Sequence, residues 1–389
     1  MTNYGQLPNF KSPAYVLHES LLKKNLELLK HVRQTAGIEI ILAFKGFSMW
    51  STFDLVRQYL DGATASSLNE ARLCFEEMKT PSHTYMAAYI PNEFDEIMQI
   101  SSHITFNSVS QYAFYIDRVK NFKAHHISVG IRVNPEYSEV ETALYNPCAV
   151  GSRLGEMVEN FDIFNGEMPE GLEGLHFHAL CESTSYELEK VLINFEERFG
   201  NWLPKLKWVN MGGGHLMTRE DYDIEHLVKV LKNFKAKYPN LTVILEPGSA
   251  IAWRTGDLVA TVLDIVNSRG IKTIMLDVSF TAHMPDTLEM PYRPRIVGAH
   301  DPSETTPPSM LFRIGGMSCL SGDYMEAYAF ENEPKIGDLI VFEDMIHYTM
   351  VKTTTFNGVG HPDISILKPN GKYKIVRRFG YKDFKNRLS

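Results

Sequence analysis

Short apolar runs alternate with amphipathic segments over the first 250 residues of the chain. Eight of these runs are typical of buried strands, and most are separated by segments with helical periodicity. The expected strands are 38–45, 62–67, 83–89, 103–108, 127–134, 171–180, 207–214 and 241–248, and clear helical segments are 68–79, 92–100 and 186–199. Eight strands alternating with helices predict an α/β fold, a (β/α)8 TIM barrel.

The pattern changes after about residue 250. Apolar runs continue, but turn-rich segments such as 300–309 separate them, and few helical patterns remain. This change predicts an all-β second domain, a β-sandwich or barrel-like antiparallel sheet. The strand-like segment 12–18 precedes the first helix and is expected to pair with that domain. The predicted domains are therefore residues 20–250 for the barrel, and residues 251–389 together with 1–19 for the β-domain.

Composition excludes several classes of protein. No run approaches eighteen apolar residues and the chain starts with polar residues, which indicates neither a membrane span nor a signal peptide, so the cytoplasm is the expected location. The net charge of −8 without a basic cluster argues against nucleic acid as a partner. The cysteines are far apart and form no CxxC pair, so neither a disulfide framework nor a zinc knuckle is indicated.

Residues that can carry chemistry stand at the ends of predicted strands. Lys45 ends the first strand, where partial desolvation lowers an amine pKa and makes the neutral amine a nucleophile. Gly212, Gly213 and Gly214 follow the seventh strand, where backbone N–H groups and a following helix N-terminus bind phosphate. Glu246 lies near the end of the eighth predicted strand. The active site of a TIM barrel lies at this edge. Each residue also has a purely structural interpretation. Lys45 would be a solvated lysine at a strand end, the three glycines a flexible turn, and Glu246 a carboxylate that bridges strands.

His176 and His178 lie two apart on one strand, so both side chains point to the same side. One imidazole of this pair can stack on a planar cofactor ring. A metal site of the kind found in barrel hydrolases is the competing interpretation, with Glu182, His215 and Glu246 as further ligands. In the second domain, the loop 315–323 carries a thiol and a carboxylate, and a hairpin turn is its simplest interpretation.

Together, these segments resemble the alanine-racemase-like (fold type III) pyridoxal-phosphate (PLP) decarboxylases, which include ornithine and diaminopimelate decarboxylases. The resemblance runs from residue 12 to residue 358. Within that family, the chain is most similar to the branch that acts on carboxynorspermidine and carboxyspermidine. The segments that carry it are LAFKGFSMW, TASSLNEARL, GLHFHALCES, NMGGGHLMT, LEPGSAI, LDVSFTAHMPD, GMSCLSGD and EDMIHYTMVKTTTFNG.

The resemblance implies roles in binding PLP. Lys45 looks like the lysine that forms a Schiff base with the cofactor, and His178 looks like the residue that stacks on its ring. Glu246 matches the partner of the pyridine nitrogen. The phosphate would be bound by the three glycines Gly212, Gly213 and Gly214 and by Tyr348.

The resemblance also implies the substrate side of the reaction, which is the decarboxylation of carboxynorspermidine or carboxyspermidine in polyamine biosynthesis. Cys319 or Lys45 would return a proton to the product carbon. The loop with Cys319 would complete the site of a neighbouring subunit, which implies a homodimer. Carboxylates for the distal amines of the substrate are expected at Glu182, Asp286 and Asp323.

Two positions depart from the pattern of ornithine decarboxylase. Ser249 stands where those relatives have an arginine after the EPG motif, and the segment 64–67 replaces an acidic residue on the second strand. Arg153 or Ser249 is expected to assist phosphate binding instead. Three alternatives remain open at this point: a diaminopimelate decarboxylase or amino-acid racemase of the same fold type, a metal-dependent barrel hydrolase, and a non-catalytic PLP carrier.

Overall fold

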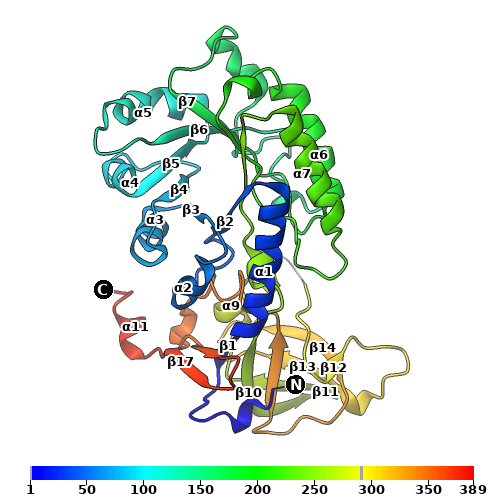
Figure 1. The fold of residues 1–389 in the computed structure, drawn as a ribbon. Helices are drawn as coiled ribbons and strands as arrows, with labels where there is room; N and C mark the ends of the chain where they lie inside the picture. The colour runs from blue at the N-terminus through cyan, green and yellow to red at the C-terminus, as the bar shows by residue number, and fades with distance from the viewer. Residues whose placement is uncertain (1, 290–291) are drawn as a thin grey trace. The chain divides into compact units, whose positions relative to one another are not determined.

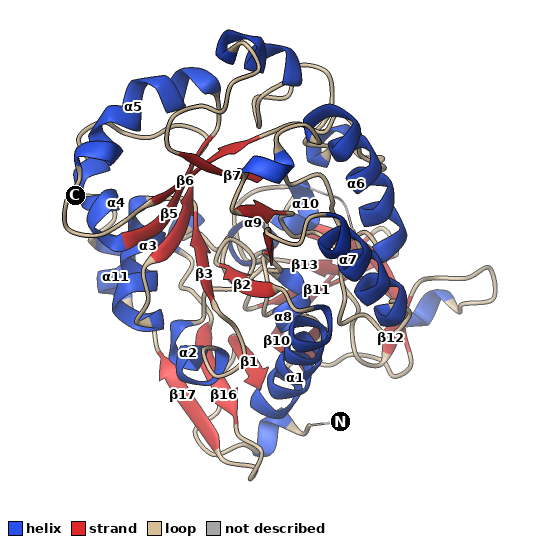
Figure 2. Ribbon diagram, turned by 45° about the horizontal axis from the view of Figure 1, so that its top comes forward, coloured by secondary structure: helices blue, strands red, loops and turns tan. Residues whose placement is uncertain are grey.

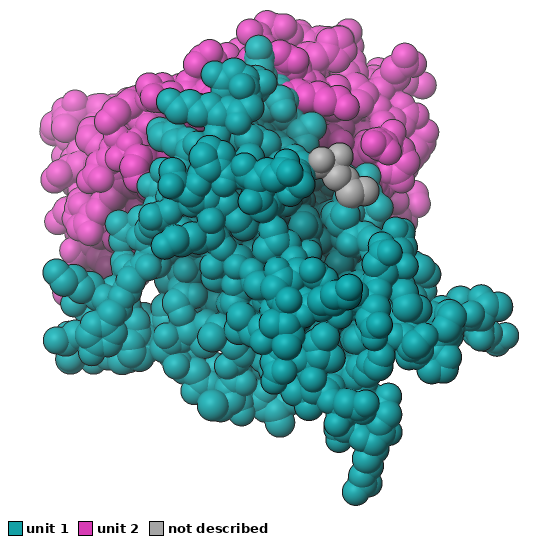
Figure 3. Space-filling view, turned by 90° about the horizontal axis from the view of Figure 1, so that it is seen from below, with its two compact units in different colours: residues 1–23, 252–389 teal, residues 24–251 magenta. Residues whose placement is uncertain are grey.

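The computed structural model describes residues 2–289 and 292–389. The chain divides into two compact units, residues 24–251 and residues 1–23 with 252–389. Figure 1 colours the chain by residue number, and Figure 3 gives each unit its own colour. In the described residues, no helix is both long and apolar enough to cross a membrane. Each unit has its own sheet, and the candidate site is built on the first.

A closed barrel of eight parallel strands forms the unit of residues 24–251, all of which are described. The strands follow one another around the barrel in chain order, and the last closes on the first where Glu39 pairs with Ile244. They are β2 (Glu39–Ala43), β3 (Gly62–Ala65), β4 (Ser82–Tyr85), β5 (Ser101–Phe106), β6 (Ser128–Arg132), β7 (Leu172–His176), β8 (Trp208–Asn210) and β9 (Thr242–Leu245). Each overlaps an expected strand, and the predicted (β/α)8 barrel is confirmed.

Helices lie outside the barrel strands (Figure 2), and all but the first and the last connect one barrel strand to the next. They are α1 (Glu19–Ala36), α2 (Phe53–Val56), α3 (Leu68–Leu73), α4 (Phe94–Ile100), α5 (Val109–Asn121), α6 (Ser185–Phe199), α7 (Ile224–Lys237) and α8 (Ser249–Ala252). Helix α6 shows why they form: Thr184 and Glu187 make a capping box at its start. Leu188, Val191 and Phe195 then recur at helical spacing and are buried against the barrel unit.

A mostly antiparallel sheet forms the second unit. Its strands are β1 (Ala14–His18), β10 (Gly256–Ser268), β11 (Ile271–Leu276), β12 (Ala299–His300), β13 (Leu311–Gly315), β14 (Tyr324–Phe330), β15 (Leu339–Glu343), β16 (Asp363–Leu367) and β17 (Tyr373–Arg377). The short helices α9 (Phe280–His283), α10 (Asp286–Glu289) and α11 (Tyr381–Lys385) accompany it. The predicted β-domain is confirmed, with a single hydrogen-bonded sheet among its described residues and two parallel pairs, β1 with β16 and β11 with β13.

The N-terminal strand β1 belongs to this second sheet. It lies between β10 and β16, with Ala14 opposite Val259 on one side and Asp363 on the other. Its first four residues are buried, which accounts for its continuous apolar pattern. The chain thus completes one strand of the second unit before it enters the barrel.

Candidate active site

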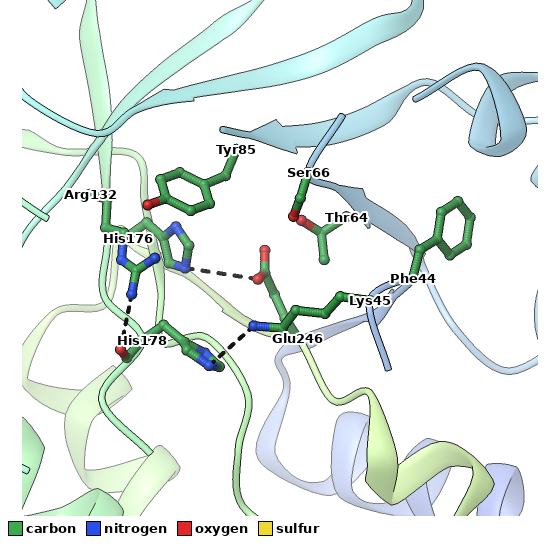
Figure 4. A pocket seen from close by; sticks show the side chains of 9 residues that line it. All are labelled: Phe44, Lys45, Thr64, Ser66, Tyr85, Arg132, His176, His178 and Glu246. Atoms are coloured by element: carbon green, nitrogen blue, oxygen red, sulfur yellow. Dashed lines mark hydrogen bonds and ion pairs between the residues drawn. The ribbon is translucent and has the colours of Figure 1, made fainter. Parts of the chain in front are cut away.

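A pocket opens at the carboxyl ends of the barrel strands (Figure 4). It is lined by side chains from six strand ends: Phe44, Lys45, Thr64, Ser66, Tyr85, Arg132, His176, His178 and Glu246. All of these residues belong to the barrel unit. Parallel strands bring their carboxyl ends to one rim, which is why residues as far apart in sequence as Phe44 and Glu246 meet here.

Lys45 follows β2 and reaches across the pocket. The residue is exposed to solvent, but it lines the pocket at the mouth of the barrel together with the other pocket residues. Desolvation there and the positive charge of Arg132 lower the pKa of the Lys45 ammonium below its ordinary value, and Glu246 opposes the shift. The ammonium is therefore easier to deprotonate than that of a surface lysine.

His178 lies beside Lys45, with 3.3 Å between Nε2 and the Lys45 Nζ. Its other ring nitrogen, Nδ1, accepts the backbone N–H of Gly213 at 3.0 Å. Burial and the adjacent Lys45 hold the pKa of His178 well below its ordinary value, so the imidazole is neutral. The ring is thereby fixed between the lysine and the glycine loop.

The glycine loop after β8 has a backbone that other residues cannot replace. Gly212 and Gly214 have φ angles of 69° and 94°. A Cβ atom at Gly213 or Gly214 would overlap a neighbouring carbonyl oxygen, that of Glu246 or of Leu180. The backbone N–H groups of Gly214 and His215 have no acceptor among the described residues, so two donors are available to an anion.

The helix expected directly after this loop is absent, and that expectation was wrong. Helix α7 begins at Ile224, ten residues after Gly214, and Asp223 caps its first turn. The intervening segment instead packs beside the loop after β7, through a bridge between Ser183 and His215. An anion at this loop would therefore be bound by backbone N–H groups, and the N-terminus of α7 would not contribute its partial positive charge.

Glu246 follows β9 directly and is 8% exposed. One carboxylate oxygen, Oε1, accepts the Asn210 Nδ2 at 2.6 Å. Burial raises the pKa of Glu246 above its ordinary value. The hydrogen bonds from Asn210 and Thr64 and the charge of Lys45 act in the opposite direction but do not cancel the effect of burial. The other oxygen, Oε2, lies 3.8 Å from the His176 Nε2.

Sequence analysis missed two polar residues of the pocket, Tyr85 and Arg132. They end β4 and β6, and the Arg132 guanidinium packs over the Tyr85 ring at 4.8 Å while its Nη2 donates to the carbonyl of His178 at 3.2 Å. Arg132 is 4% exposed. The available signal was a lone arginine within an otherwise apolar strand, because a buried charge requires a partner.

The remaining predicted site residues lie on loops or, for Asp286, at the start of a short helix. Glu182 is exposed in the loop after β7 with a φ of 50°. Asp286 begins α10; its Oδ2 accepts the Thr349 and Tyr292 hydroxyls at 2.9 and 3.0 Å, and its buried Oδ1 has no partner among the described residues. Tyr348, next to Thr349, adopts a φ of 24°.

Cys319 and Asp323 share one loop of the second unit. Cys319 is exposed, and its N–H donates to the Asn357 Oδ1 at 2.8 Å. Asp323 is 4% exposed and accepts the N–H groups of Thr281 at 3.1 Å and Ser318 at 3.0 Å. Asp323, one of the carboxylates expected to bind substrate, therefore accepts hydrogen bonds that stabilise the loop carrying the Cys319 thiol.

The pocket residues fit PLP by their chemistry. A desolvated lysine suits covalent attachment of an aldehyde, a glycine cradle with two free N–H donors suits a phosphate, and a buried carboxylate suits a ring nitrogen. His176 adds two buried ring nitrogens without a partner among the described residues. Within those residues, no group of three or more His, Cys, Asp or Glu side chains is arranged to hold a metal ion.

Comparisons with known proteins agree with this chemistry. The family model "Pyridoxal-dependent decarboxylase, C-terminal sheet domain" matches residues 15–346. The chain is 48% identical over 383 residues to the carboxyaminopropylagmatine decarboxylase of Synechocystis, covering 98% of this chain and 97% of the relative. It is 43% identical to the carboxynorspermidine/carboxyspermidine decarboxylase of Campylobacter jejuni, covering 96% and 97%.

Solved structures give the same result. The crystal structure of carboxynorspermidine decarboxylase from Campylobacter jejuni, complexed with norspermidine, superposes with a TM-score of 0.89 at 40% identity, covering 97% of this chain and all of that one. Diaminopimelate decarboxylase from Helicobacter pylori, at 18% identity and a TM-score of 0.82, covers 97% of both chains and shares the fold. These matches decide against the metal-dependent hydrolase and the non-catalytic carrier. The chain belongs to the family of pyridoxal-dependent decarboxylases, lyases that use PLP as their cofactor.

Proposed function

We propose that this enzyme decarboxylates a carboxylated polyamine, carboxynorspermidine or carboxyspermidine, and releases norspermidine or spermidine with carbon dioxide. The observation that carries the proposal is the full-length similarity to relatives named for these substrates. Carboxyaminopropylagmatine is the second candidate substrate, because the relative named for it is also similar over the full length.

The three candidate substrates share their reacting end and differ at the far end. Each carries an amine and a carboxylate on the carbon that loses carbon dioxide. Agmatine ends in a planar guanidinium, whereas norspermidine and spermidine end in an ammonium, and the last two differ by one methylene. Discrimination by one methylene is worth about 1–3 kcal/mol, so we expect the enzyme to accept both ammonium substrates.

The barrel residues have distinct tasks in this reaction. When bound, PLP supplies a conjugated ring that accepts the electrons of the bond to the departing carboxylate. Lys45 offers the amine for covalent attachment, and His178, whose ring lies beside that amine, stacks on the cofactor ring. Glu246 keeps the ring nitrogen protonated. The amides of the glycine loop bind the phosphate, together with the Tyr348 hydroxyl.

The reacting carbon must then receive a proton, which we assign to Cys319 or Lys45. The Cys319 thiol is exposed. The backbone N–H groups of its loop donate to the side chains of Asn357 and Asp323 and so hold the loop in place. A preformed loop with an exposed thiol is suited to enter the site of another subunit. The proposal therefore includes a homodimer with shared active sites.

The distal cationic groups of the substrate require carboxylates. Asp286 has a buried oxygen without a partner among the described residues, and Glu182 is an exposed carboxylate in the loop that follows the pocket strand β7. Asp323 already accepts two backbone N–H groups. We therefore assign the substrate amines to Glu182 and Asp286, and Asp323 to the thiol loop.

The proposed location is the cytoplasm. All four cysteines are free thiols in the described structure. Thiols persist in reducing compartments, whereas exported proteins commonly carry disulfides. PLP-dependent synthesis of a small polyamine is consistent with that compartment.

A substrate panel tests the proposal. Carbon dioxide release is measured with carboxynorspermidine, carboxyspermidine and carboxyaminopropylagmatine, and with diaminopimelate, ornithine and lysine. We expect kcat/KM for the two ammonium polyamines to agree within about 100-fold and to exceed that for the three amino acids. A preference for diaminopimelate would contradict the proposal, and a preference for carboxyaminopropylagmatine would establish the second candidate.

A further inference from the structure

His176 ends β7 and lines the pocket, but the proposed reaction gives it no task. The residue is 2% exposed, and neither ring nitrogen has a hydrogen-bond partner among the described residues. Buried polar atoms without partners are costly and therefore rare in proteins. Unpaired nitrogens at a pocket wall thus indicate a bond that forms when the site is filled.

The neighbours of His176 orient its ring toward Glu246. The Nε2 atom lies 3.8 Å from the Glu246 Oε2, along the dashed line in Figure 4. The Tyr85 ring packs edge-on against the imidazole, with 5.3 Å between centroids and an interplanar angle of 88°. Asn210 already donates to the other carboxylate oxygen. Thr64 also donates to this carboxylate, so a small movement of Glu246 would add His176 as a third donor, at Oε2.

The charges around His176 keep it neutral. Desolvation lowers the pKa of His176 far below its ordinary value, and Arg132 on β6, Lys45 after β2 and His83 on β4 act in the same direction. Glu246 is the acidic group that faces it. A neutral imidazole carries one N–H, and a carboxylate opposite Nε2 favours the tautomer with the hydrogen on that atom.

We propose that His176 is a positioning residue that donates its Nε2–H to Glu246 and so keeps that carboxylate charged beside the ring nitrogen of bound PLP. The inference rests on the role proposed above for Glu246. Donors on both oxygens reduce the affinity of a carboxylate for a proton. A proton shared between Glu246 and the ring nitrogen then stays on the ring, where the reaction needs it.

The test compares H176M, which removes the donor, with H176Q, whose side-chain amide lies the same number of bonds from the backbone. PLP affinity is measured by fluorescence titration of the apoprotein, and ring protonation by the pH dependence of the visible absorbance of bound PLP. For H176M we expect PLP affinity and kcat to fall about 10- to 100-fold, KM to change little, and the absorbance transition to move to lower pH. H176Q should recover most of each loss.

His103 supplies a matched control, because it is another barrel histidine, stacks on His83 with 3.8 Å between centroids and does not line the pocket. H103F should leave PLP affinity and the absorbance transition unchanged. Equal effects of H176M and H176Q, or the same shift in H103F, would show that His176 only fills space and would overturn the inference.

A double-mutant cycle separates this inference from the role of Glu246. E246Q alone should weaken PLP binding and shift the absorbance transition, and H176M should add less than about twofold in the E246Q background. If E246Q weakens PLP binding as expected, but H176M has its full effect in the E246Q background as well, only the inference about His176 is overturned. If E246Q changes neither measurement, the proposed role of Glu246 fails and the inference fails with it.

Discussion

At the scale of single residues, one hydrogen bond fixes the tautomer of His178. The N–H of Gly213 donates to the His178 Nδ1, so in the neutral imidazole the hydrogen is on Nε2. That Nε2 lies 3.3 Å from the Lys45 Nζ. An N–H directed at the amine favours the neutral form of the amine, in the same direction as the burial that lowers the pKa of Lys45.

Borohydride reduction tests the residue that holds PLP. Peptide mapping of the reduced protein should place the pyridoxyl label on Lys45, and K45A should lack it and lose kcat about 10²- to 10⁴-fold. Because the pKa of Lys45 is lowered, its amine stays neutral to lower pH than an ordinary lysine of pKa about 10.4. Trapping as a function of pH should therefore have its midpoint below that value. A label on any other lysine would exclude the assignment of Lys45.

At the scale of elements, the tight packing of the glycine loop can be tested by comparing Gly214 with a loosely packed glycine elsewhere in the chain. Gly151 and Gly214 both have positive φ angles, but a Cβ at Gly151 meets nothing within 4 Å, whereas one at Gly214 overlaps Leu180. G151A should cost only the backbone strain, about 1–2 kcal/mol of unfolding free energy. G214A should cost a further 1–3 kcal/mol or so from overpacking and weaken PLP binding. Equal stability and equal PLP affinity of the two variants would argue against a tightly packed cradle.

The elements also show what sequence can predict. Eight apolar runs gave the barrel, and the family motifs placed Lys45, His178 and Glu246, which meet in one pocket. The helix after the glycine loop was predicted wrongly because an apolar pattern fixes strand ends better than the length of an irregular connection. Arg132 and Tyr85 were missed because they end β6 and β4, two strands that β5 separates, and their contact depends on the closed barrel.

At the scale of the whole molecule, the exposed surface around Cys319 supports the proposed dimer. Met317, Leu320 and Phe356 are 46%, 45% and 44% exposed, and the bond from Cys319 to Asn357 links the two segments that carry them. Exposed apolar side chains clustered around an ordered loop are typical of an interaction surface. The second copy of this chain is the partner that the proposed function supplies.

Mixing two inactive variants tests whether the sites are shared. K45A lacks the cofactor lysine and C319A lacks the thiol, so each homodimer should have two damaged sites. In a heterodimer with shared sites, one site receives both damaged residues and the other receives neither. Random exchange makes half of the dimers mixed, so the mixture should regain about a quarter of the wild-type activity. Subunit exchange followed by size-exclusion chromatography and the carbon dioxide assay measures this. If Cys319 serves its own barrel, or the enzyme is a monomer, the mixture will show only the sum of the two residual activities.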